Sequence, residues 1–140
     1  MATEIATRFI LRGNQFDPDE ITALLGIQPI EVWRYGDLIP RTIMRHKDNG
    51  WLLSTESQPL DEENSIDLMR QIDTIVGRLR PHTAKLQEIC TRLRLNAKLY
   101  CVLSIEGEDR PAIQFDPDTV QWLAQIHAGI DVVTYFEREQ

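Results

Sequence analysis

The sequence predicts an α+β fold, a mainly antiparallel sheet with helices packed on it, and three patterns support this prediction. Apolar and polar residues alternate over 5–12 and 97–106, which is typical of half-buried strands. Apolar residues recur every three to four positions over 68–79, which indicates an amphipathic helix. The phrase Phe-Asp-Pro-Asp occurs at 16–19 and again at 115–118, and predicts a capped helix near each end of the chain.

Each copy of the repeated phrase has the order of residues that starts a helix. Asp17 or Asp116 suits the N-cap, because its carboxylate accepts a hydrogen bond from a free amide of the first turn, and the next residue is proline. A Gly-Ile pair follows each helix, at 26–27 and 129–130, and we expect the glycine to cap it in the left-handed conformation. These positions predict that the second capped helix is one turn longer than the first. Helix capping explains the paired carboxylates without metal or acid-base chemistry.

Between the two capped helices, the first half of the chain contains two more expected strands. After the strand over 5–12 and the first helix, we expect a short strand near 30–34 and then an ordered loop that continues to Lys47. Asn49-Gly50 is a turn signal, and it precedes an expected strand over 51–55.

The second half begins with helices and ends with strands. Asp61 or Asn64 suits the cap of the long amphipathic helix, and Pro81 ends or kinks that helix. A further helical segment reaches Leu93 before the long strand. We then expect, in order, a turn at 107–110, a return strand over 111–115, the second capped helix and a final strand over 131–136.

This order of elements is compatible with a ferredoxin-like arrangement with an internal pseudo-two-fold repeat and a helical insertion. The chain would be a single domain over 1–140, in which half-repeats at about 5–55 and 97–136 are joined by the helical segment 61–94. The two capped helices would form the symmetric pair.

Composition narrows the functional classes. The chain has 140 residues, of which 15 are basic and 22 acidic, for a net charge of -7. An acidic chain is not expected to bind nucleic acid or anionic membranes, and favours a basic protein partner. No apolar run is long enough to span a membrane, so we expect a cytoplasmic protein. Cys90 and Cys101 fall on apolar faces and are expected to be core thiols.

The chain resembles a bacterial family catalogued as domain of unknown function 4279. The resemblance covers nearly the whole chain, up to Gly129-Ile130-Asp131 and Tyr135. It rests most strongly on Phe9, Gly13, the segment 16–22, Leu25-Gly26-Ile27, Pro29, Trp33, Gly36-Asp37 and Trp51. The family has no established activity, so the resemblance implies a small single-domain protein with no catalytic residue to carry over. It also suggests an immunity-type partner of another protein.

The segment from Glu31 to Lys47 is a basic, aromatic island in an acidic chain. Arginines interleaved with aromatic rings can bind an anion and stack on a planar ligand. The alternative is a loop that covers the core, with arginines paired to the acidic residues of 56–73. The candidate ligand-binding residues are Trp33, Arg34, Tyr35, Asp37, Arg41 and Trp51. Gly36-Asp37 also fits a simple turn.

No other pattern in the sequence points to chemistry. The three histidines, His46, His82 and His127, lie in separate segments without metal-ligand spacing, and the chain has no nucleophile motif or glycine-rich phosphate loop. We therefore expect no catalytic residue, no metal and no cofactor, and an enzyme is the least favoured class.

Two hypotheses follow. The first is a non-catalytic, cytoplasmic protein-interaction module, such as an immunity-type partner of a basic protein. The alternative is a regulatory domain that binds a small anionic or planar ligand. By analogy with ferredoxin-like sheets, which often pair, we also consider a homodimer.

Overall fold

The computed structural model describes residues 3–59 and 67–136. The strands are β1 (Glu4–Gly13), β2 (Glu31–Trp33), β3 (Asn49–Ser54), β4 (Gln58–Pro59), β5 (Asn96–Ile105) and β6 (Gly129–Phe136). The helices are α1 (Pro18–Leu25), α2 (Asp67–Leu79), the short 3-10 helix η1 (Arg80–His82), α3 (Thr83–Arg92) and α4 (Pro117–Gln125). The expected α+β class is confirmed.

The strands form one mixed sheet that is mostly antiparallel. Its order is β2-β3-β1-β5-β6, and the short β4 also pairs with β1. β1 lies antiparallel to both β3 and β5, whereas β5 and β6 are parallel. The parallel pair is joined through α4, as expected for a strand-helix-strand crossover.

The strand order differs from the expected ferredoxin-like arrangement. In that fold each strand-helix-strand unit is split by another strand, but here β5 and β6 are direct neighbours. The two halves also differ in the place of their second strand, because β3 separates β2 from β1, whereas β6 lies directly beside β5. The repeated phrase therefore marks two similar helix starts, at α1 and α4, in two halves whose strand orders differ.

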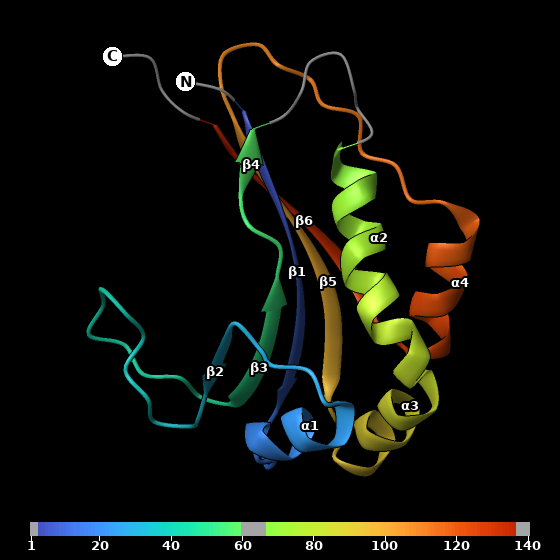
Figure 1. Ribbon diagram of the computed structural model, residues 1–140. Coiled ribbons are helices and arrows are strands. Elements are labelled where there is room, and N and C mark those ends of the chain that lie inside the picture. The colour runs from blue at the N-terminus through green and yellow to red at the C-terminus, as the bar shows by residue number, and fades with distance from the viewer. Residues whose placement is uncertain (1–2, 60–66, 137–140) are drawn as a thin grey trace.

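Helices cover one face of the sheet and leave the other face open (Figure 1). The covered face of β1 and β5 presents buried apolar side chains at alternate positions, among them Phe9, Leu11, Leu99 and Leu103. The amphipathic α2 contributes Leu68, Ile72, Ile75, Val76 and Leu79 to the same core. No helix among the described residues is long and apolar enough to cross a membrane.

The repeated phrase caps both helices as predicted. The Asp17 carboxylate accepts from the Asp19 amide at 3.0 Å, and the Asp116 carboxylate accepts from the Thr119 amide at 2.9 Å. Gly26 has φ 66° and caps α1 in the left-handed conformation.

The C-terminal cap predicted at Gly129 is wrong. α4 ends at Gln125, and His127, with φ 55°, makes the left-handed turn two residues earlier than Gly129, which instead begins β6. α4 has 9 residues and α1 has 8, so the extra turn expected for the second helix is also absent.

The return strand predicted over 111–115 is also wrong. A turn does follow β5, with Gly107 at φ 62°, but both edges of β5 are already paired, one with β1 and one with β6. No edge of β5 remains for a returning strand. The helix caps predicted at Asp61 or Asn64 lie outside the described residues.

Candidate ligand-binding site on the open face of the sheet

The open face of the sheet brings cationic and aromatic side chains together from neighbouring strands. On β1, Arg8, Ile10 and Arg12 alternate with the buried core residues, and so lie on the uncovered side. Cross-strand register places Arg8 opposite Tyr100 and Ile10 opposite Lys98. The sheet thus gathers these cations around Tyr100, although they lie far apart in the sequence.

Two hollows lie on this face. One has a volume of about 390 Å³ and is lined by Arg12, Gly13, Asn14, Asp48, Arg94, Asn96, Lys98 and Tyr100. The other has a volume of about 260 Å³ and is lined by Arg8, Ile10, Arg12, Tyr100, Val102, Val133 and Tyr135. Because Arg12 and Tyr100 line both, we treat the two hollows as one site and call it the open-face trough.

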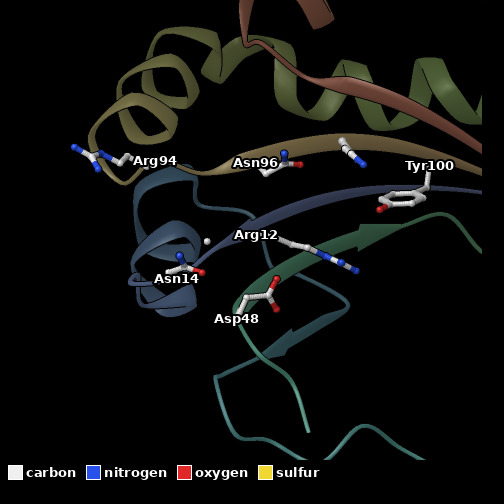
Figure 2. A pocket seen from close by; sticks show the side chains of 8 residues that line it. Arg12, Asn14, Asp48, Arg94, Asn96 and Tyr100 are labelled. Carbon is white, nitrogen blue, oxygen red and sulfur yellow. The ribbon is translucent and has the colours of Figure 1, made fainter. Parts of the chain in front are cut away.

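Two arginines of the trough, Arg8 and Arg12, differ from its lysine in how their charges are paired. Lys98 is paired, with its Nζ 3.2 Å from Oδ2 of Asp131. Within the described residues, neither Arg8 nor Arg12 forms an ion pair. Figure 2 shows Arg12 extending along the sheet toward Tyr100, whereas Arg94 lies at the far end of the hollow and points away. The cationic centre of the trough is therefore at Arg8 and Arg12.

Trp33 supports Arg12 from the side. Its indole is 6% exposed, and it stacks on His46 with ring centroids 4.9 Å apart and planes 16° apart. Its Nε1 donates to the Asp48 carboxylate at 3.0 Å, and the Arg12 guanidinium carbon lies 5.5 Å from the ring centroid. A guanidinium at this distance from an indole is held by cation-π attraction. Trp33 thus positions Arg12 and leaves its charge available.

The predicted site residues do not converge on one cavity. Trp51 is fully buried on the helix-covered face, where its Nε1 donates to the Thr22 hydroxyl at 3.1 Å. Trp33 pairs with Gly50, the residue before Trp51, so its ring lies on the opposite face. The sheet therefore separates the two tryptophans, and only Trp33 adjoins the trough.

The other four predicted residues, Arg34, Tyr35, Asp37 and Arg41, lie in residues 34–48, which we call the arm. The Arg34 guanidinium donates to Asp17 at 2.9 Å and to Asp19 at 3.1 Å. The Asp17 contact is the main cause of the raised pKa of Arg34. The Asp37 carboxylate accepts from the Arg34 amide at 2.8 Å, which closes a turn. These contacts secure the base of the arm.

The arm projects from the β2 end of the sheet (Figure 1) and exposes apolar side chains. It is ordered by backbone hydrogen bonds, such as that from the Ile39 amide to the Met44 carbonyl at 2.8 Å, and by a bridge between Leu38 and Arg45. Near its tip Ile43 is 97% exposed and Met44 62% exposed. Tyr35 and Arg41 are also exposed, so the arm is a surface and not a pocket wall.

The residues that sequence reasoning missed are Arg8, Arg12, Lys98 and Tyr100. A signal was present, because Arg8 and Arg12 alternate with apolar residues and so point away from the core. That pattern is typical of any solvated strand face, and only the pairing of β1 with β5 brings the arginines beside Tyr100.

The geometry supports binding more than covalent chemistry. In the described part of the chain, no three His, Cys, Asp or Glu side chains gather where they could hold a metal ion. Burial raises the pKa of both Cys90 and Cys101 to about 11, so both thiols are protonated at neutral pH and are poor nucleophiles.

These features define a small α+β protein whose sheet has one covered face and one open face with a cationic, aromatic trough. The chain belongs to the family described as domain of unknown function (DUF4279), whose model matches residues 3–137. No curated protein and no solved structure matches the chain.

Proposed function

We propose that this protein is a binding domain that holds a small anionic ligand with a planar group in the open-face trough. The observation that carries the proposal is the presence of Arg8 and Arg12, without carboxylate partners among the described residues, beside Tyr100 in a hollow surface. Arginine binds carboxylates and phosphates through paired hydrogen bonds, and a tyrosine ring offers a surface for a planar group.

The charge of the trough also indicates what it would not bind. The whole chain carries a net charge of -7, yet the centre of the trough is cationic. A basic protein, the partner favoured by composition, would be repelled from Arg8 and Arg12. The small-ligand hypothesis therefore fits this face better than a basic partner does.

A thermal-shift and calorimetry experiment tests the proposal. The probes are pyrophosphate, adenosine monophosphate as a planar anion, and adenosine as its neutral counterpart. A ligand at 100 times its dissociation constant stabilises the protein by about 2.7 kcal/mol. We expect the planar anion to bind most tightly and adenosine least.

Two variants and a matched control locate the binding. Arg8→Gln and Arg12→Gln should each weaken binding of the planar anion, whereas Arg78→Gln should leave it unchanged, because Arg78 is an exposed arginine on α2 in the helix layer. If no anion binds, or if all three variants weaken binding equally, the proposal is wrong.

We infer that the arm serves a second function as a protein contact. The specific observation is Ile43, which is 97% exposed close to exposed Met44 and to the cations Arg41 and Arg45. Apolar side chains gathered on a projecting segment often mark an interaction surface. The neighbouring cations favour an acidic partner, whereas composition favours a basic one.

Site-specific photo-cross-linking in host cells tests the arm. A photoreactive residue at position 43 should give a discrete cross-linked product. The same residue at Gln121, an exposed position on α4, should not give that product. Identical products from both positions, or none from position 43, would remove the evidence for a specific contact.

A further inference from the structure

The sheet has two edges that differ in how they are protected. The β2 edge has 3 residues and begins with the charged, exposed Glu31. The β6 edge has 8 residues, contains no proline, and has Asp131 as its single charged residue. A long edge strand with little charge is prone to pair with another strand, and natural proteins usually shorten, charge or cover such edges. In the order of the described strands β6 is terminal, so its outer edge is unpaired.

The side chains of β6 are apolar and exposed on both faces. Ile130 is 37% and Val132 41% exposed, although both lie on the same side as the helices. Tyr135 on the open face is 59% exposed, and Phe136 is 67% exposed. The helix layer covers β1 and β5 and does not bury these residues. A neighbour that added a strand to this edge would bury apolar side chains on both faces at once.

We propose that β6 pairs antiparallel with β6 of a second copy of the chain, about a two-fold axis at Val133. The proposal does not depend on ligand binding in the trough. A two-fold interface must be self-complementary, and an antiparallel pair of identical strands meets that condition. In this register Ile130 lies opposite Phe136 of the second copy, Val132 opposite Thr134, and Asp131 opposite Tyr135. The result is one continuous sheet across the dimer.

Charge and side-chain pairing favour this register. Directly opposite residues in an antiparallel pair share a face, and side chains alternate between faces along each strand. In a two-fold pair of identical strands, opposite residues are therefore an even number of positions apart, and the axis passes through a residue and not between two residues. With the axis at Val133, Asp131 faces a tyrosine and never its own copy, and it keeps its contact with Lys98 at 3.2 Å. With the axis at Val132, Phe136 would face Ala128, which lies outside β6, and would lose its apolar partner.

Sedimentation velocity and light scattering of the wild-type chain test the dimer. A pair of charge variants then tests the register, because residue 132 faces residue 134 of the second copy. Val132→Lys with Thr134→Lys places lysine opposite lysine twice, and should raise the dimer dissociation constant at least about tenfold. Val132→Glu with Thr134→Lys places glutamate opposite lysine twice, and should retain the dimer. Far-ultraviolet circular dichroism at low concentration checks that both variants fold.

The results can overturn the proposal in three ways. A wild-type chain that is monomeric up to about 100 µM has no such interface, since a specific homodimer has a dissociation constant well below this concentration. A wild-type dimer whose two charge variants associate equally well uses another surface. If both charge variants dissociate, the register is wrong, because an axis at Val132 would place glutamate opposite glutamate in one variant and lysine opposite lysine in the other.

A cross-linking experiment remains informative if a charge variant fails to fold. Val133→Cys would place two cysteines face to face on the axis, within the range that a disulfide bridges. Tyr135→Cys is the control, because its two copies would lie about 14 Å apart along the strands. Mild oxidation should yield a covalent dimer of the first variant only. Equal yields from both variants, or no covalent dimer from either, contradict the proposed axis.

Discussion

Gly50→Ala is the substitution for which the structure makes the sharpest prediction. Gly50 lies on β3 directly beneath Trp33, its cross-strand partner on β2. A Cβ added at Gly50 would meet Cε2 and Cζ2 of the Trp33 ring at less than 3.0 Å, a separation that real Cβ atoms essentially never show. Because the obstacle is a broad, stacked ring, the indole has to leave its position.

The cost can be worked out from what the ring loses. A tryptophan buries roughly 150–250 Å², so losing half of that area costs about 2–3 kcal/mol at roughly 25 cal/mol per Å². The hydrogen bond from Trp33 to Asp48 adds about 1 kcal/mol. Alanine regains about 0.5–1 kcal/mol relative to glycine in a strand. We expect Gly50→Ala to lower the free energy of unfolding by about 2–3 kcal/mol.

Urea denaturation at constant pH measures this change, with Gly77→Ala as the matched control. Gly77 is exposed within α2 and has no atom within 4 Å of an added Cβ, so alanine there should stabilise by about 0.5–1 kcal/mol. In a Trp33→Ala background the cost of Gly50→Ala should disappear. A cost below about 0.5 kcal/mol, or one that persists without Trp33, would refute the reasoning. Release of Trp33 should also weaken anion binding, because Trp33 positions Arg12.

Three further predictions concern the helix layer and the core. Gln71→Ala removes the acceptor of the buried Thr7 hydroxyl and should cost about 1–3 kcal/mol in urea denaturation, so a neutral result would show that the bond does not matter. Cys101, whose pKa burial raises to about 11, should resist alkylation at pH 8 until the protein unfolds, and mass spectrometry would reveal any rapid native reaction. The backbone amide of Thr119 lowers the pKa of Asp116, so the charged carboxylate contributes stability above its unfolded pKa and loses it as pH falls through its folded pKa. The stability difference between wild type and Asp116→Asn should therefore shrink from about pH 5 to pH 2, and a constant difference would contradict this assignment.

Local signals in the sequence were sufficient for most of the individual elements. Asp17 and Asp116 predicted two helix starts correctly, because an N-cap depends only on groups within one turn. Alternation predicted β1 and β5 with their buried faces, since that pattern follows from the pleat of a single strand. The same reasoning failed at 111–115, because a strand forms there only if a neighbouring strand has a free edge. β6 occupies the edge of β5 that the predicted strand would have needed.

The candidate site in the structure differs from the predicted one for a related reason. Trp33 and Trp51 are near in sequence and both aromatic, which suggested a common pocket. Trp33 pairs with Gly50 and so shares its face, whereas Trp51, the next residue along β3, points to the opposite face. This separation depends on the register in which β2 pairs with β3. Arg12 and Tyr100 are 88 positions apart in the numbering (100 − 12), yet they line the same hollow.

The sequence by itself determined the α+β class, the N-terminal caps of α1 and α4, the apolar faces and membership of the family, because each rests on short-range patterns or on residue identity. Tertiary structure alone decided which face of the sheet stays open, that Arg8 and Arg12 lie beside Tyr100, and which described strand is left at the edge. These outcomes depend on strand order and register, and the free energy that sets them comes from burying side chains distant in sequence against one another.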